Sequence, residues 1–370
     1  MKLKNKLFKS CLTGLVLSAN GIAGAADPNL SDYSAVSGSA MNIAAGSTVE
    51  RKLAASAALT IGSGAFMGPK GALTPDRPDI YAGAAVTIGA SATIGNVISG
   101  AAAGIGANAN ANDVTAGAAV TLGANAHVRN IAAGAAITMG AGSTAVNSIS
   151  MIGVITSGAG SNAACTGLVT VAGTVCSITG NASTVLDKTG HGSKLVTQSG
   201  IMTELNEAVA KKVTDAAVAR QLEIDIGPIQ LPFLLGTNLP DGETLTAGTY
   251  YGSAMNIPAN ATLTLNAQGA STAEFVFDLS GALTFGAGSK IVLINPADAT
   301  TSSTGTGTTW TITWITGGSI NMGAGTEFRG VAYSAGSINA ATSSVDCGGL
   351  YAAGAVSVKS IGSYDCITGN

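Results

Sequence analysis

The amino-acid sequence predicts a mainly β protein, a three-sided β-solenoid with 17–18-residue coils and one long α-helix packed alongside. The first observation is a run of four consecutive 17-residue units between Ala82 and Ile149, with no insertion between them. The second is that each unit holds a short alternating core, such as residues 85–88, followed by a small-residue corner such as Gly89-Ala90. The third is a single amphipathic segment, nearly free of glycine, in the middle of the chain.

Strands of two to four residues cannot bury an apolar face alone. The units therefore have to stack on one another, about 4.8 Å apart, with one coil for each repeat. Helical repeats are disfavoured because every unit combines glycine with β-branched residues, which weaken helices and suit strands and tight corners.

Residues 1–26 have the features of a secretory signal peptide. Four lysines precede Cys11, an apolar stretch follows to Ile22, and Ala23-Gly24-Ala25 forms an A-x-A cleavage site. We therefore expect a secreted, extracellular protein. No later apolar run reaches the length of a membrane span, so no membrane partner is expected.

Four cysteines remain after this segment: Cys165, Cys176, Cys347 and Cys366. An even number in an exported chain favours two disulfides, paired locally, although buried free thiols are an alternative. A metal site is disfavoured because the sequence contains no C-x-x-C and only two histidines. We expect neither a metal nor another cofactor.

The composition limits the classes of partner. Charged residues make up 10%, aromatic residues 4%, and the formal net charge is -3. A nearly neutral surface with few charged residues has little attraction for nucleic acid or for anionic lipid. The hydrophobicity of the chain disfavours disorder.

Residues 27–193 are expected to form N-terminal solenoid coils. The segment Ser37 to Thr48 fits the repeat template, and a second unit begins at Ala55. Between that unit and Ala82, three prolines and several charged residues indicate a loop at one corner. After Ile149 the pattern loosens into irregular coils or a cap.

Residues 194–225 are expected to form the flanking helix. Leu205, Val209, Val213 and Ala216 form one apolar stripe, which predicts packing against the side of the solenoid. The polar positions Glu207, Lys211, Lys212 and Asp215 are expected to face solvent.

Residues 226–370 are expected to resume the solenoid. The hexapeptide at 252–257, GSAMNI, repeats the one at 38–43, and three later units begin at the equally spaced positions Gly318, Gly336 and Gly354. Trp310 and Trp314 share one strand face, and this spacing favours core packing over sugar stacking.

The order of several short motifs here resembles the secreted microbial ice-binding proteins. The motifs are Leu245 to Tyr250, Ala261 to Leu265, Phe275 to Phe277, Ile291 to Asn295 and Thr326 to Gly330, preceded by the helix. The resemblance covers about Lys194 to Val358. It implies an irregular β-solenoid flanked by one helix, and adsorption to ice or to an ordered water surface. The 17-residue block then looks like an expansion of the family's N-terminal portion.

A row of small polar residues recurs once in each unit, between two apolar neighbours. Because side chains alternate along a strand, this row should face outward. We predict that it forms the ice-binding ladder, with the candidates Thr60, Thr87, Thr121, Thr138, Thr284, Asn321 and Asn339. A structural alternative stays open, since threonine favours solvated strand faces and asparagine ladders can simply stabilise a solenoid.

A second candidate row lies after the following corner. It contains Thr48, Thr93, Thr144 and Thr262, and it is interrupted by His127, Lys290 and Glu327. The resemblance implies a T-x-x-T-like strand here, but alanine replaces the first threonine. Ice affinity through this row would therefore be modest.

An enzyme is not expected. Catalytic solenoids need clustered acids and bases, whereas Asp113, Arg129 and His127 are expected to lie well apart in the repeat register. The competing function is a secreted structural or adhesive protein of a matrix or filament, for which self-association is possible. Such a filament needs uncapped ends that can stack.

Overall fold

The computed structural model describes residues 29–68, 77–145, 149–150, 154–159, 162–163, 169–172, 175–178, 191–226, 238–294, 309–346 and 348–361. The predicted signal peptide lies outside these residues, as do Cys165, Cys347 and Cys366. Cys176 belongs to strand β20 (Val175–Ile178). The two disulfides therefore stay predictions.

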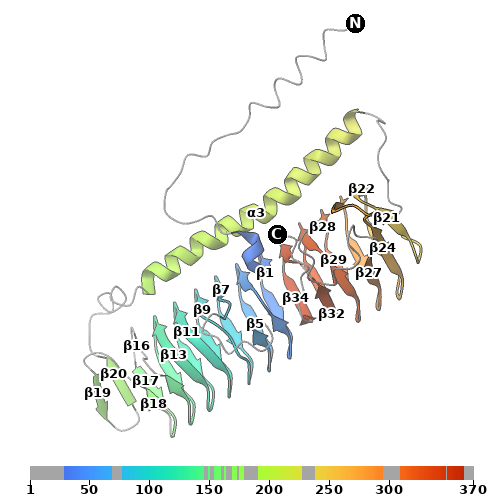
Figure 1. Ribbon diagram of the computed structural model, residues 1–370. Helices are drawn as coiled ribbons and strands as arrows, with labels where there is room; N and C mark the ends of the chain where they lie inside the picture. The colour runs from blue at the N-terminus through green and yellow to red at the C-terminus, as the bar shows by residue number, and fades with distance from the viewer. Residues whose placement is uncertain are drawn as a thin grey trace, which may run out of the picture.

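Three parallel sheets form the sides of a long solenoid (Figure 1), which confirms the predicted fold class. We name the sheets face A, face B and face C in the order in which each coil passes through them. Strand β11 (Asn110–Ala116) and strand β13 (His127–Ala133) each begin on face C and continue onto face A, and β32 (Ile338–Asp346) spans faces B and C.

The remaining strands of face A are β1 (Tyr33–Ser37), β4 (Lys52–Ala55), β7 (Ile80–Ala82), β9 (Val97–Ser99), β16 (Ile149–Ser150), β22 (Gly248–Gly252), β25 (Thr272–Leu279), β28 (Thr309–Thr316), β31 (Val331–Ser334) and β33 (Leu350–Ala352). Those of face B are β2 (Met41–Ile43), β5 (Leu59–Ile61), β8 (Val86–Ile88), β10 (Ala103–Ile105), β12 (Val120–Leu122), β14 (Ile137–Met139), β17 (Val154–Ser157), β23 (Met255–Ile257), β26 (Leu283–Phe285), β29 (Ile320–Met322) and β34 (Val356–Ile361). Those of face C are β3 (Thr48–Val49), β6 (Phe66–Met67), β15 (Thr144–Ala145), β18 (Asn162–Ala163), β21 (Thr244–Thr246), β24 (Thr262–Asn266), β27 (Lys290–Ile294) and β30 (Glu327–Arg329).

The strand register reproduces the predicted coil length. Val97 is paired with Val114, and Val114 with Ile131, so this block keeps the predicted period from one coil to the next. On face B the same step separates Ala103 from Val120. Every residue of a coil therefore lies beside its counterpart in the next coil.

The chain does not wind from one end of the solenoid to the other. It starts in the middle at β1 and winds outward to β17, and helix α3 (His191–Ile226) then runs back along the solenoid (Figure 1). The C-terminal coils return from the far end until β33 pairs with β1 and β34 pairs with β2. The two solenoid segments consequently form one continuous stack of coils.

The interior differs between the two segments. Inward residues of the 17-residue coils are small or aliphatic, such as Val86 and Ile88, and are almost fully buried. The first C-terminal coils are longer, since Gly248 pairs with Phe275, and Phe275 pairs with Ile312. Their interior holds aromatic rings, and Phe277 stacks on Trp314 at a centroid distance of 4.0 Å. Trp314 is fully buried, as its spacing predicted.

Glycine columns allow the coils to approach closely where face A turns into face B. At Gly83, Gly100, Gly117 and Gly134, an added Cβ would lie 2.1–2.3 Å from a carbonyl oxygen of the preceding coil. Two non-bonded heavy atoms cannot lie that close, so the backbone of one coil would have to shift. The recurrent glycine is therefore a packing requirement at this corner.

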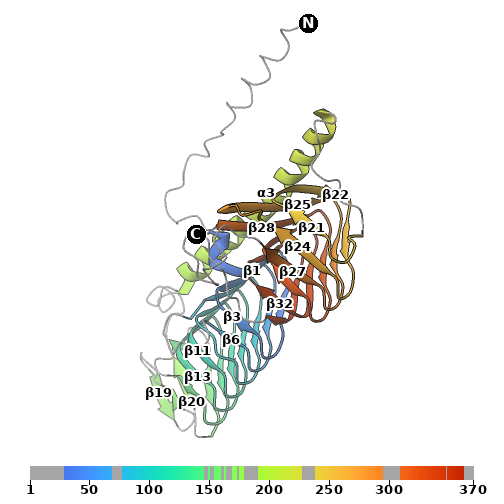
Figure 2. The ribbon, with the colours of Figure 1, turned by 45° about the vertical axis from the view of Figure 1, so that its right-hand side comes forward.

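The helix covers face A along the solenoid (Figure 2). Leu205, Val209 and Ala216 of the predicted stripe are buried, and Val213 is half-buried; Met202, outside the predicted stripe, is also buried. Glu207, Lys211, Lys212 and Asp215 are exposed, as predicted. Outward side chains of face A complete a second apolar cluster with the helix: Tyr33, Val36, Ala54, Tyr81 and Tyr351. Burial in this cluster raises the pKa of Tyr33 to about 12.

Two polar contacts fix the helix to different parts of the solenoid. The Asn206 amide donates to the Ser56 hydroxyl of the N-terminal coils at 2.7 Å. Arg220 forms a largely buried ion pair with Asp278 of the C-terminal coils, and burial lowers the pKa of Arg220. The helix therefore holds both segments of the solenoid.

One end of the solenoid carries an antiparallel hairpin. Strand β19 (Val169–Ala172) pairs with β20, and β20 pairs antiparallel with β17. The last parallel strand of face B is thus paired on its outer side.

Replacing Gly100 should destabilise the fold, whereas replacing Gly104 should not. The new methyl at Gly100 would lie 2.2 Å from the Gly83 carbonyl oxygen, while the nearest atom to a methyl at Gly104 is 4.0 Å away. We expect Gly100→Ala to lower the free energy of unfolding by about 1–3 kcal/mol. Gly104→Ala should leave it unchanged or raise it by about 0.5–1 kcal/mol. Denaturant titration followed by circular dichroism measures both, and equal midpoints would contradict the close approach.

Removing the buried leucine of the helix should weaken its attachment to face A. Leu205 is fully buried, whereas Val218 on the same helix is 55% exposed. We expect Leu205→Ala to cost about 2–4 kcal/mol of unfolding free energy, and Val218→Ala less than about 0.5 kcal/mol. Thermal unfolding compares the two variants. If Leu205→Ala proves as harmless as Val218→Ala, the helix is not docked as described.

Candidate functional site

The outward polar residues of face B form one continuous ladder across both segments of the solenoid. Backbone pairing places each of them beside the next, and the row passes directly from the C-terminal coils to the N-terminal coils at the pair Ser357–Asn42. In spatial order the ladder is Asn238, Asn256, Thr284, Asn321, Asn339, Ser357, Asn42, Thr60, Thr87, Gly104, Thr121, Thr138 and Thr156.

The structure therefore brings all candidates of the first predicted row together. Thr60, Thr87, Thr121 and Thr138 are exposed, and so are Asn321 and Asn339, while Thr284 is half-buried. Their strand neighbours on both sides are buried, because side chains alternate along the strand.

The row that the sequence predicts also includes Asn42, Gly104, Asn256 and Ser357 beside the seven candidates, but it lacks two ladder positions. Asn238 pairs with Asn256, and Thr156 pairs with Thr138. Both residues lie in coils where the repeat is degenerate, but each is separated from its neighbour in the row by the length of one regular coil. That spacing could have identified them.

Small residues on both sides keep the ladder flat. From β23 to β14 the outward row before it contains only alanine and serine: Ala254, Ala282, Ser319, Ser337, Ala355, Ala40, Ala58, Ala85, Ala102, Ala119 and Ala136. The row after it is mainly glycine. In this row a Cβ at Gly89 would lie 2.4 Å from the Ser63 backbone nitrogen, so a larger residue does not fit there. The corresponding position in β34 is Lys359.

The corners that border face B are nearly constant in length. Three residues lie between Ala82 and Val86, and four between Ile88 and Thr93, and other coils repeat this pattern. The long connections within coils, residues 68–79, 267–271 and 295–308, all join face C to face A. The described corners beside face B therefore contain no long insertion.

The second predicted row lies on face C and is less uniform. Thr48, Thr93 and Thr144 are half-buried, and their row also contains Phe66, Asn110 and His127. The ring Nδ1 of His127 lies 2.5 Å from the Thr144 hydroxyl. In the C-terminal coils Thr262 is followed by Lys290 and Glu327, which form an ion pair at 3.0 Å.

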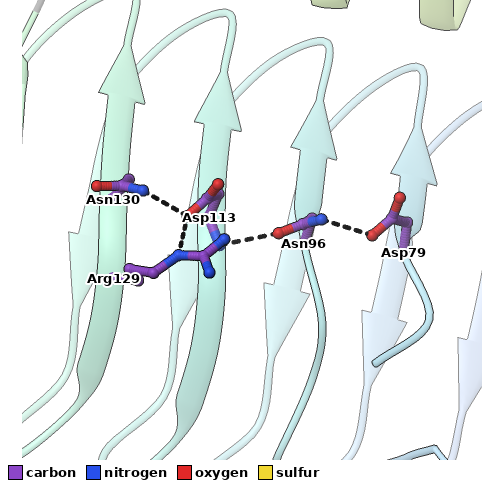
Figure 3. A network of polar contacts seen from close by, with 5 residues as sticks. All are labelled: Asp79, Asn96, Asp113, Arg129 and Asn130. Atoms are coloured by element: carbon purple, nitrogen blue, oxygen red, sulfur yellow. Dashed lines mark hydrogen bonds and ion pairs between the residues drawn. The ribbon is translucent and has the colours of Figure 1, made fainter. Parts of the chain in front are cut away.

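Charged side chains of the 17-residue coils gather at the corner between faces C and A (Figure 3). Asp113 accepts hydrogen bonds from Arg129 at 2.8 Å and from Asn130 at 2.7 Å, and its backbone N–H donates to Asn96 at 3.2 Å. Asn96 in turn donates to Asp79 at 2.8 Å.

This network corrects one expectation from the sequence. Asp113 and Arg129 were expected to lie well apart, yet they form an ion pair, because a separation slightly shorter than one coil places them beside each other in adjacent coils. The Asp113 carboxylate raises the pKa of Arg129 through this hydrogen bond. The described residues include no group of three or more metal-ligating acids, histidines or cysteines that could hold a metal ion.

Face B thus differs from the other two faces. It combines an outward ladder of hydroxyl and amide groups with small flanking residues, and among its described ladder and Ala/Ser positions none is charged. Face A is covered by the helix, and face C carries the ion pair of Lys290 with Glu327. In the part of the chain that the structure describes, no helix is long and apolar enough to cross a membrane.

Comparison with known proteins identifies the family. The model of the ice-binding-like family matches residues 131–362, more than half of the chain. The protein therefore belongs to the ice-binding-like family, as the motif order predicted. The match begins near the end of the 17-residue block, and the origin of that block as an expansion stays a prediction.

Several solved structures are similar to this chain. One is an ice-binding protein from an Antarctic biological consortium, at 12% identity, covering 89% of this chain and 86% of that chain with a TM-score of 0.39. Another is a glycosylated ice-binding protein from an Arctic yeast, at 15% identity, 92% and 93% coverage and a TM-score of 0.36. A third is the DUF3494 domain of a Shewanella frigidimarina ice-binding protein, at 15% identity, 91% and 96% coverage and a TM-score of 0.36. No curated protein matches the chain.

Proposed function

We propose that the protein is an extracellular ice-binding protein that adsorbs to ice through face B and inhibits ice recrystallisation. The observation that carries the proposal is the continuous ladder from Asn238 to Thr156, which crosses both segments of the solenoid. Membership of the ice-binding-like family supports the same function.

The chemistry of the ladder suits contact with ordered water. A threonine hydroxyl provides one donor and two acceptor positions, and its β-branched side chain is stiff about χ1. The methyl group beside it restricts the orientations of nearby water. Because the ladder residues follow the coils, they repeat at about 4.8 Å, which presents a regular array to a crystal surface.

Adsorption through many weak contacts requires a flat and rigid surface. Each ladder residue alone contributes little binding free energy. Once one residue contacts the ice, however, the contacts of the other residues form within the same complex and reinforce the adsorption. Apart from the position of Lys359, the rows beside the ladder hold small residues and proline, and the described corners are nearly constant, which favours close contact with a flat surface. Charges would hold their own hydration shells and disturb the array.

The extracellular location rests on the signal-like segment at residues 1–26 and on the even number of cysteines after it. The proposal assigns the protein a binding role and no enzymatic activity. The antiparallel hairpin on β17 favours a discrete domain over a filament that grows by stacking from that end.

Lysine substitutions should show whether face B or face C carries the ice-binding activity. We expect the triple variant Thr87→Lys, Thr121→Lys, Thr138→Lys to raise the concentration needed to stop ice grain growth by at least about tenfold. A long charged side chain on three rungs prevents close contact with a flat surface. The measurement is ice recrystallisation inhibition together with thermal hysteresis, with circular dichroism to confirm the fold.

The matched control is the triple variant Thr48→Lys, Thr93→Lys, Thr144→Lys on face C, which should keep its activity. Loss of activity in this control alone would move the site to face C. An inactive wild-type protein that stays folded would refute the ice-binding proposal, and sedimentation would then test self-assembly into a matrix.

Filling the gap in the threonine run should strengthen adsorption. Gly104 lies in the ladder between Thr87 and Thr121, and its backbone is not in the left-handed region. We expect Gly104→Thr to lower the protein concentration needed for recrystallisation inhibition by a factor of about 2–4, since it adds one more methyl contact. Gly104→Ala is the control and should change activity less. A folded Gly104→Thr protein with weaker activity would speak against a contact at this rung.

A further inference from the structure

The ladder on face B changes its chemistry along its length. One end, which we call the asparagine end, comprises Asn238, Asn256, Thr284, Asn321, Asn339, Ser357 and Asn42. The other, the threonine end, comprises Thr60, Thr87, Gly104, Thr121, Thr138 and Thr156. The boundary lies between Asn42 and Thr60, which are adjacent in space.

Polar groups at the asparagine end bond to each other along the solenoid. The side-chain amide of Asn256 donates to the Asn238 side-chain oxygen at 3.1 Å, and Asn339 donates to Asn321 at 3.1 Å. In the neighbouring row the Ser319 and Ser337 hydroxyls each accept a backbone N–H from the next coil at 3.2 Å. These groups therefore stabilise the stacking of the coils.

Hydroxyls at the threonine end are not used in this way. Within the described part of the chain, the side chains of Thr60, Thr87, Thr121 and Thr138 make no hydrogen bond to another protein group, and all four are exposed. Their outward neighbours are alanine on one side and glycine on the other, with no hydroxyl to compete for water. Their donor and acceptor positions are open to solvent.

From this contrast we infer that the threonine end is the ice-contacting part of face B, while the asparagine end holds the coils in register. The inference rests on the proposed function. Threonine has a methyl and a hydroxyl on a stiff side chain. Asparagine has no methyl, and asparagine amides of this ladder form hydrogen bonds with neighbouring ladder residues. The strands that carry Thr60, Thr87 and Thr121 lie outside residues 131–362, so most of the site lies where the family model does not reach.

Reciprocal exchanges of threonine and asparagine test this division without adding charge. One variant carries Thr87→Asn, Thr121→Asn and Thr138→Asn, which extends the amide ladder. The other carries Asn256→Thr, Asn321→Thr and Asn339→Thr, which removes both side-chain amide bonds. Each purified variant is compared with the wild type in recrystallisation inhibition and thermal hysteresis, and thermal unfolding by circular dichroism verifies that it is folded at the assay temperature.

We expect the first variant to need at least about tenfold more protein for the same inhibition, because three methyl contacts are lost. The second should lose thermal stability and yet inhibit at a concentration equal to or below that of the wild type. Full activity in the first variant, or a comparable loss in a folded second variant, would overturn the division of the ladder.

The outcome also separates the two proposals. Suppose that the wild type is active, the lysine variant of face B is inactive and the Thr→Asn variant keeps its activity. Face B then stays the ice-binding surface, and only the division of the ladder into two ends is refuted. If the folded wild type is inactive, the proposed function falls and the division falls with it.

Discussion

Hydrogen bonding between stacked coils is the constraint on which the whole structure depends. Because each coil lies about 4.8 Å from the next, every position of the repeat becomes a column along the solenoid. Columns inside the molecule must be apolar. The column at one tight corner is glycine at Gly83 and Gly100, where the next backbone leaves no room for a Cβ, although Ser56 occupies this column in the coil before Gly83. The outward column of face B is free of both demands, so its threonines and asparagines are available for function.

The sequence predicts those features that depend on a single column or a single element. The 17-residue period, the outward ladder through Thr87 and Thr121, and the helix with its Leu205 stripe follow from local alternation and spacing. The pairing of β1 with β33 does not follow, because local sequence patterns carry no information on which distant coil a given coil stacks against. The Asp113–Arg129 pair was missed for a related reason, since it depends on the offset between adjacent coils.

The choice between the two candidate rows needed the structure. Both contain threonines at repeat spacing, and sequence alone left them open. We base the proposed choice on their surroundings. The structure adds that Lys290 and Glu327 form an ion pair in the face C row, and that the described corners beside face B are short. Face B keeps its flatness because both of its corners are short. The asparagine bonds, such as Asn339 to Asn321, show that residues of the face B row also stabilise the stacking of the coils.

The route of the chain through the solenoid couples the number of coils to the length of the helix. Helix α3 has 36 residues and returns the chain along face A, beside the coils that precede it and those that follow it. Each additional coil lengthens the stack by about 4.8 Å, and the returning chain covers that distance with about three more helical residues at 1.5 Å each. Duplication of a 17-residue unit would therefore enlarge the exposed surface by one rung, and it would also require roughly one further turn of helix. The length of this helix thus limits how far the repeat block can grow by duplication alone.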